Sequence, residues 1–341
     1  MSTKVKIISV LLCLALTGFV YKTANRETVV KFIPFFFHAK FTPDDILSPG
    51  NGIFFLETTD RMDPPSLVLC AVESAARINP DKPVAFFMKG LPDINSAEEH
   101  TQALNSFPTL APYYNIYLFP LRMETLLSDT PLLPWYQKVN PVKEVHWTHV
   151  SSDASRLALM YKYGGLYMDT DIISLRPVPE KNFLVAESSQ ISSNGVFGFD
   201  SHRDFTWTCM EDFLKNYNGA IWGNQGPALF TRVLKQFYCD IPPFKGDEDL
   251  KCGNVSFLNP RRFYPIECRY WMKFFEVWKA DPPFNESYAL HLFNYANRGE
   301  RRVMVPGSNT LVEHLYMRNC PATYQAVLEK RSTHLTNVPL I

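Results

Sequence analysis

The chain has 341 residues, of which 46% are hydrophobic and 20% are charged, so it is long enough to bury one large core or two ordinary ones. Its 34 basic and 34 acidic residues cancel. Because binding to a nucleic-acid backbone depends mainly on neutralising phosphates, the lack of a basic surplus argues against a nucleic-acid partner.

The N-terminal region has the pattern of a membrane-targeting segment. Lys4 and Lys6 precede an uncharged apolar run, residues 7–21, that ends at Lys22. A positive flank before such a run predicts a transmembrane signal anchor, with residues 1–6 in the cytosol and the rest of the chain in the lumen. The run is short for a span, so a cleaved signal peptide is the alternative. The thin membranes of the early secretory pathway favour the retained anchor.

The anchor is followed by a segment without a regular hydrophobic period. Residues 22–50 end in a cluster of turn-forming residues, and we interpret them as a stem. We expect a luminal catalytic domain at residues 51–325 and a C-terminal tail at residues 326–341.

The hydrophobic periodicity of the expected domain alternates between strands and helices. Predicted strands cover residues 53–56, 84–88 and 115–121, and predicted helices cover residues 67–78, 204–217 and 227–238. The order strand, helix, strand is typical of a parallel sheet that is covered by helices. The sequence therefore predicts an α/β fold.

Cysteines and glycosylation sequons agree with a luminal location. Cys13 lies in the apolar run. The other six cysteines would lie in the lumen, where they can form disulfides. Cys239 and Cys252 are close enough in the chain to close a local loop, whereas the remaining pairings stay open. Asn254 and Asn285 each begin a sequon and would carry glycans in the lumen.

The strongest candidate for a functional site lies in the middle of the chain. Residues 151–153 are expected to cap a helix that ends at Gly164, and residues 166–168 form a strand that leads to Asp169 and Asp171. In extended backbone, residues two apart point the same way, so both carboxylates are expected to face one spot. Such a pair suits Mn²⁺ or Mg²⁺, which is typically held by carboxylates together with diphosphate oxygens.

The flanking residues distinguish this motif from an ordinary surface turn. A lone Asp-x-Asp more often marks a solvated turn, but here residues 166–168 precede it and residues 172–175 are expected to continue the same sheet. The chemistry points to a nucleotide-sugar donor. Breaking a sugar–phosphate bond builds negative charge on the departing diphosphate, and a bound cation stabilises that charge.

The stretch SDASRLALMYKYGGLYMDTD resembles the Asp-x-Asp signature of a retaining glycosyltransferase family. This family contains α1,4-galactosyl- and α1,4-N-acetylglucosaminyltransferases. The likeness extends to residues 53–60, 87–91, 221–227, 287–293 and 319–324. It implies a Rossmann-like, GT-A type nucleotide-sugar fold behind an N-terminal anchor, in a single-pass type II protein of the Golgi membrane.

Residues 60–65 and 307–314 most resemble the family members that transfer N-acetylglucosamine. The resemblance therefore implies retaining transfer from UDP-GlcNAc, in α1,4 linkage, to a terminal β-galactose of mucin-type O-glycans. One alternative is a lactosylceramide α1,4-galactosyltransferase that uses UDP-Gal, and another is a catalytically silent Golgi glycan-binding protein of the same fold. A glycosidase is the rival enzyme class, with two flanking carboxylates and no metal.

The same resemblance implies roles for residues around the motif. Asp169 and Asp171 would hold the metal and the diphosphate, while Asp153 and Arg156, one helical turn apart, would contact the donor sugar. A local surface ion pair is the alternative for the second pair. His291 is the only imidazole of an apolar run, which is usual for a core histidine. The resemblance favours a third metal ligand instead, and neutral imidazole suits Mn²⁺ better than Mg²⁺.

Two amides before a predicted helix are further candidates. By resemblance, Gln225 would lie beside the reacting anomeric carbon, and Asn224 would bind the donor. The alternative is a turn that leads into the helix at Pro227.

Three other polar side chains are expected near the substrates. Asn194 would lie near the donor or the acceptor, or else form a type I′ hairpin turn with Gly195. Thr58 and Thr59 follow the first predicted strand, where the carboxyl ends of parallel strands form the nucleotide crevice. They are expected to contact uridine, and a polar turn is the alternative.

Overall fold

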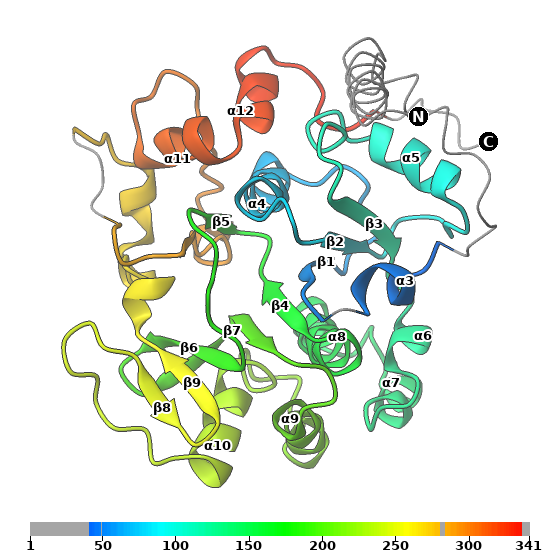
Figure 1. Cartoon of the computed structure of the whole chain (residues 1–341), viewed down its shortest axis with the longest axis vertical. Helices are drawn as coiled ribbons and strands as arrows, with labels where there is room; N and C mark the ends of the chain where they lie inside the picture. Colours follow the sequence, from blue (N-terminus) through cyan, green and yellow to red (C-terminus); the bar gives the residue numbers. More distant parts are fainter. Residues whose placement is uncertain (1–40, 49, 280–283, 336–341) are drawn as a thin grey trace, which may run out of the picture. The chain divides into compact units, whose positions relative to one another are not determined.

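The computed structural model describes residues 41–48, 50–279 and 284–335 (Figure 1). The predicted cytosolic tail, residues 1–6, and the predicted anchor, residues 7–21, lie outside these ranges. Within the described part of the chain, no helix is long and apolar enough to cross a membrane.

A mixed eight-stranded sheet forms the centre of the fold (Figure 1). The strands are β1 (Ile53–Glu57), β2 (Val84–Met88), β3 (Ile116–Pro120), β4 (Gly165–Met168), β6 (Phe183–Ser188), β7 (Ile191–Phe199), β8 (Leu250–Cys252) and β9 (Val255–Leu258). Their order is β3-β2-β1-β4-β7-β6-β9-β8. The first four are parallel, and β7 runs antiparallel to both of its neighbours. The predicted parallel α/β sheet is confirmed for this half, and the structure adds a mixed half, in which β6 and β9 are parallel and the other pairs are antiparallel.

Helices cover both faces of the sheet. They are α3 (Pro43–Leu47), α4 (Ser66–Ile78), α5 (Ala97–Asn105), α6 (Met123–Leu127), α7 (Leu133–Lys138), α8 (Trp147–Tyr163), α9 (Asp204–Lys215), α10 (Pro227–Phe237), α11 (Leu311–Asn319) and α12 (Pro321–Leu328). Short 3₁₀ helices are η1 (Pro260–Arg262), η2 (Cys268–Phe275) and η3 (Ala296–Arg298). The helix α3 lies in residues that we expected to be stem, and its Leu47 is fully buried.

Alternate side chains of β1 enter two different hydrophobic cores. Ile53 and Phe55 pack with α4 and α11 on one face, whereas Phe54 and Leu56 pack with α8, α9 and α10 on the other. A strand buried on both faces appears in the sequence as a continuous apolar run, which is why this strand was visible there.

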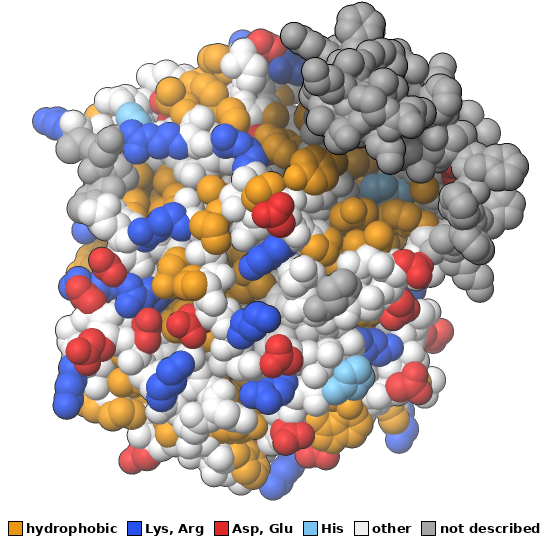
Figure 2. Space-filling model, in the orientation of Figure 1, with side chains coloured by type: hydrophobic (Ala, Val, Ile, Leu, Met, Phe, Trp, Pro, Cys, Tyr) orange, Lys and Arg blue, Asp and Glu red, His pale blue; other side chains and the backbone are white. Residues whose placement is uncertain are grey.

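On the face seen in Figure 2, basic and acidic side chains are interspersed.

The start of α8 differs from the prediction. The helix begins at Trp147, so Asp153 lies inside it and does not cap it. The Ser151 hydroxyl donates to the Thr148 carbonyl, 3.2 Å away. It therefore bonds to a backbone group within the helix and does not cap the helix N-terminus. The predicted C-terminal end is confirmed, because Gly164 ends the helix with a φ of 63°.

Residues 172–175 do not continue the central sheet, contrary to expectation. Strand β5 (Ile172–Ser174) pairs antiparallel with β10 (Ala289–His291) in a separate two-stranded sheet. The cause is a turn in which the Ile172 N–H donates to the Asp169 carbonyl at 3.1 Å and redirects the chain. His291 is thereby paired with Ile172, next to Asp171.

Four of the six cysteines outside the apolar run form disulfides. Cys239 pairs with Cys252, as the spacing predicts, and Cys70 pairs with Cys320 across 250 residues of sequence. The six do not all pair, because Cys209 is a buried thiol and Cys268 is an exposed one.

Candidate active site

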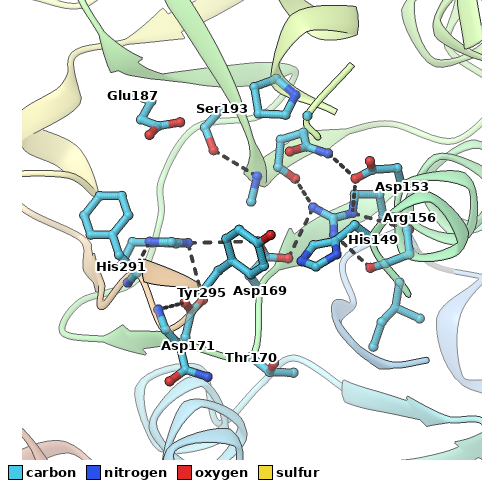
Figure 3. A pocket seen from close by; sticks show the side chains of 18 of the residues that line it. His149, Asp153, Arg156, Asp169, Thr170, Asp171, Glu187, Ser193, His291 and Tyr295 are labelled. Carbon is cyan, nitrogen blue, oxygen red and sulfur yellow. Dashed lines mark hydrogen bonds and ion pairs between the residues drawn. The ribbon is translucent and has the colours of Figure 1, made fainter. Parts of the chain in front are cut away.

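A cavity of about 560 Å³ lies where β1 and β4 end (Figure 3). Its lining includes residues 56–58 at the end of β1, the first half of α8, residues 169–171 after β4, and residues 193–195 of β7. Residues 293–296 close another side. Ligands of α/β sheets bind outside the carboxyl ends of the parallel strands, so the cavity occupies the expected place.

Three of the predicted residues form one cluster in this cavity. The nearest ligand atoms of Asp169, Asp171 and His291 all lie within 4.8 Å of one another. The Nε2 atom of His291 is 3.3 Å from Asp171 Oδ1 and 4.0 Å from Asp169 Oδ2. The two carboxylates meet through the turn after β4, and not through extended backbone as we expected.

The charges of the cluster depend on its surroundings. Burial disfavours the charged form of Asp169, but Arg156 and His291 hold its pKa below the ordinary value. Burial also disfavours protonation of His291, yet Asp171 and Asp169 raise its pKa overall. Two carboxylates with one imidazole are a donor set that fits Mn²⁺.

Arg156 of α8 links the cluster to the central sheet. Its guanidinium donates to the Asn194 carbonyl at 2.7 Å, lies 3.2 Å from Asp169 Oδ1, and stacks 4.5 Å above the centre of the Tyr167 ring. The Tyr167 hydroxyl also donates to Asp169 Oδ1, at 2.6 Å. Asp169 is therefore held by two donors that are themselves buried.

Asp153 lies beside Arg156 in the same buried network. Its Oδ1 accepts a hydrogen bond of 2.6 Å from the Asn194 side chain and is 3.7 Å from Arg156 Nε. Burial raises the pKa of Asp153 to about 6. Asp153 and Arg156 are both less than a tenth exposed, so the alternative of a surface ion pair is wrong. The hairpin alternative for Asn194 is also wrong, because Asn194 lies inside β7.

The two threonines after β1 have different surroundings. Thr58 lines the cavity and donates to the Thr148 carbonyl at 3.2 Å. The Thr59 hydroxyl instead donates to Glu57 at 2.7 Å, and Thr59 is not among the cavity-lining residues. A contact of either residue with uridine stays a prediction.

The structure does not bring Gln225 or Asn224 into the cavity lining. Gln225 is buried, and both ends of its amide are used: the oxygen accepts from the Asn218 N–H at 3.0 Å, and the nitrogen donates to the Phe213 carbonyl at 2.8 Å. The Asn224 side chain donates to the Asn216 carbonyl at 2.8 Å. Both amides hold the loop between α9 and α10 in place, and their predicted roles toward the donor stay predictions.

The cavity also contains residues that the sequence patterns did not single out. They are Glu187, Tyr264, Trp222, Tyr295 and His149. Burial raises the pKa of Glu187, which lies on the side of Ser193 and His291 (Figure 3). Trp222 belongs to the segment 221–227 that carried part of the resemblance, so a signal for it existed. Nothing in the local pattern marked Glu187, because it is the polar end of an ordinary strand.

The two sequon asparagines are accessible. Asn254 lies in the tight turn between β8 and β9, and Asn285 precedes β10; both side chains are exposed. Their positions permit glycosylation, which stays a prediction.

Comparison with known proteins decides the family. Residues 65–190 match the family described as "Glycosyltransferase sugar-binding region containing DXD motif", and residues 198–327 match the "Alpha 1,4-glycosyltransferase conserved region". The alpha-1,4-N-acetylglucosaminyltransferase of Homo sapiens is 50% identical over 316 residues, which are 93% of this chain and 92% of that protein. The chain belongs to the α1,4-glycosyltransferase family.

The chain is also similar to a second curated relative and, weakly, to a solved structure. The lactosylceramide 4-alpha-galactosyltransferase of Homo sapiens is 41% identical over 82% of this chain and 78% of its own length. Among solved structures, the galactosyltransferase LgtC with donor and acceptor sugar analogs is 14% identical, with a TM-score of 0.40 over 78% of this chain and 95% of that chain. Family membership confirms the predicted enzyme class, a glycosyltransferase with an Asp-x-Asp motif.

Proposed function

We propose that this α1,4-glycosyltransferase transfers N-acetylglucosamine from UDP-GlcNAc, with retention, to a terminal β-galactose of mucin-type O-glycans. The observation that carries the proposal is the cluster of Asp169, Asp171 and His291 beside the buried Arg156 in one cavity. The donor sugar is favoured by the higher identity to the N-acetylglucosaminyltransferase, 50% against 41% for the galactosyltransferase.

Each residue of the cluster has a part in this proposal. Asp169, Asp171 and His291 would hold Mn²⁺, which when bound acts as a Lewis acid that stabilises the departing diphosphate. Arg156 balances the charge of Asp169 and keeps its carboxylate directed at the cavity. Asp153, whose Oδ1 is engaged by Asn194, offers its other oxygen to a donor-sugar hydroxyl.

The test is a matrix of donors and acceptors with the purified full chain. UDP-GlcNAc, UDP-Gal, UDP-Glc and UDP-GalNAc are each supplied with Mn²⁺ to a β-galactose-terminated O-glycan and to lactosylceramide. The expected product is α1,4-linked N-acetylglucosamine on the O-glycan, with the linkage read by NMR and activity lost on addition of EDTA. A preference for another donor, or activity that survives EDTA, would contradict the proposal.

A second candidate is transfer of galactose from UDP-Gal to lactosylceramide. The lactosylceramide 4-alpha-galactosyltransferase relatives favour it, since they cover most of this chain at about 40% identity. It replaces the first proposal if UDP-Gal with lactosylceramide is the best pair in the same matrix. Binding of UDP with Mn²⁺ in calorimetry, without transfer in any pair, would instead favour a silent glycan-binding protein.

We also propose that residues 7–21 anchor the chain in the Golgi membrane with its C-terminus in the lumen. Support comes from the charged flank before the apolar run, the two disulfides and the two exposed sequons. In sealed vesicles, a C-terminal tag should resist protease until detergent is added, and removal of N-glycans should lower the apparent mass. A tag that is digested without detergent, or a mature N-terminus beyond residue 21, would contradict the anchor.

A further inference from the structure

Two exposed aromatic rings stack on each other at the mouth of the cavity. Trp222 lies in the loop between α9 and α10, and Tyr295 follows β10; both line the cavity. Their ring centres are 5.4 Å apart and their planes differ by only 4°. Trp222 is 49% exposed and Tyr295 is 36% exposed. Large aromatic surface left this open beside a polar cavity suggests a ligand that covers it.

The two rings of the stack have different neighbours. The Arg298 guanidinium lies 4.1 Å from the centre of the Tyr295 ring. His149 meets the same ring edge-on, with 4.7 Å between the ring centres (Figure 3). Tyr295 is thus engaged by several neighbours. Trp222 has fewer such contacts: within the described part of the chain, its ring stacks on Tyr295 alone among aromatic side chains. Trp222 is about half exposed, and we call the face of its indole that points away from Tyr295 the outer face.

Both loops that carry the stack are fixed to the site below it. The N–H of Asn294, next to Tyr295, donates to Asp171 Oδ2 at 2.8 Å. On the other side, a Cβ atom at Gly226 would approach the Asn194 amide to 2.6 Å, so the Trp222 loop packs directly on β7. The position of the stack is thereby tied to the Asp169–Asp171 motif and to Asn194.

We infer that the outer face of Trp222, backed by Tyr295, is the platform on which the sugar ring of the acceptor stacks. A hexose presents an apolar face of C–H groups, to which the flat face of the indole is complementary. Its rim of hydroxyls can form hydrogen bonds with the polar groups that line the cavity, such as His149 and Arg298. The inference rests on the proposed function and adds to it the subsite that binds the terminal β-galactose.

The location separates this platform from the donor. A diphosphate must reach Asp169 and Asp171, and the donor sugar is proposed to reach Asp153, all of which are mostly buried. The acceptor approaches from solvent once that inner space is filled. The exposed Trp222 ring at the mouth of the cavity is therefore within reach of the substrate that enters second, and that substrate is the acceptor.

The test compares Trp222→Ala, Trp222→Phe and a control, Phe237→Ala, in the full chain. Phe237 is 57% exposed on α10 and does not line the cavity. For Trp222→Ala, we expect the acceptor KM to rise by about fivefold or more, since a stacked aromatic contact contributes about 1 kcal/mol beyond buried area. The donor KM and the slow hydrolysis of UDP-GlcNAc without acceptor should stay unchanged. Trp222→Phe should recover most of the acceptor affinity, and Phe237→Ala should match the wild type.

Saturation-transfer NMR with a β-galactoside, in the presence of UDP and Mn²⁺ but no sugar donor, gives a readout independent of turnover. Ring protons of the sugar should receive saturation from the wild type and from Phe237→Ala, and much less from Trp222→Ala. If an active Trp222→Ala variant keeps its acceptor KM, or instead loses donor affinity, this inference is overturned and the proposed function stands. A wild-type chain that transfers to no β-galactoside overturns the proposed function, and this inference falls with it.

Discussion

Asp171 combines two tasks at the scale of a single residue. One oxygen faces His291 at 3.3 Å, and the other accepts the Asn294 N–H at 2.8 Å. For Asp171→Asn, we expect transfer to fall by about a hundredfold or more at saturating Mn²⁺, because a principal charge at the reacting diphosphate is lost. The melting temperature should change little, since the amide oxygen can still accept the backbone hydrogen bond. Initial rates and a thermal melt check both parts; a rate above about a tenth of the wild type would contradict the metal role.

His291 allows a second test at the same scale. If it binds the ion, His291→Ala should raise the Mn²⁺ concentration for half-maximal activity by about tenfold or more, because even neighbours of a ligand change metal affinity by that factor. Excess Mn²⁺ should then recover part of the activity.

The control measurement for His291→Ala is its melting temperature. A histidine that only fills the core would leave a cavity and unpaired partners when removed, which lowers stability. A lower melting temperature with unchanged Mn²⁺ dependence would reject the ligand role.

At the scale of secondary-structure elements, His100 makes the packing of α5 on β3 sensitive to pH. Its Nε2 accepts a hydrogen bond of 3.1 Å from the Leu118 N–H of β3, and its ring stacks 4.4 Å from Phe41. Burial lowers the pKa of His100 from 6.5 to about 4, so the folded chain keeps this imidazole neutral. The unfolded chain takes up that proton at higher pH. The stability that His100 contributes is therefore complete above pH 6.5 and is lost as the pH falls towards 4.

The matched variant for this prediction is His100→Gln. A glutamine can accept the Leu118 hydrogen bond but does not titrate, so the fall in stability between pH 6.5 and 4 should be shallower than in the wild type. Urea unfolding at several pH values measures the difference. Equal slopes for the two proteins would show that other groups cause the acid sensitivity.

At the scale of the whole molecule, the C-terminal helices are tied to the first long helix. The Cys70–Cys320 disulfide joins α4 to the start of α12 across 250 residues. One turn further along α4, the buried Glu73 accepts hydrogen bonds from the Ala322 and Thr323 N–H groups, each at 2.8 Å. The two links close the last elements of the fold onto its first half.

Removal of this disulfide should have a large effect on stability. By chain entropy alone, a loop of this length corresponds to about 5 kcal/mol, whereas the short Cys239–Cys252 loop corresponds to about 3 kcal/mol. We therefore expect the pair Cys70→Ser and Cys320→Ser to lower the free energy of unfolding more than Cys239→Ser and Cys252→Ser. Urea unfolding under non-reducing conditions compares them. A smaller loss for the long loop would mean that Glu73 and the helix contacts alone hold α12.

Local patterns in the sequence determined the elements whose burial is uniform. The strands β1 and β2 are covered on both faces, so each reads as a short apolar run and was predicted nearly to the residue. The Asp169–Asp171 pair was also visible in the sequence. The two residues are only two positions apart, and they follow an apolar strand. The start of α8 was missed, since the burial of Val150 extends the helix beyond its apparent cap.

Only the tertiary structure decided which distant residues share the site. His291 reaches Asp171 because β10 pairs with β5, and that pairing depends on a turn that the strand pattern did not reveal. Trp222 meets Tyr295 because two loops pack on the same cavity. Periodicity reports whether a residue faces a core, but it carries no information on which side chains of other segments lie beside it. Contacts across long stretches of sequence depend on the packing of the whole sheet and its helices, and so they became visible only in the folded chain.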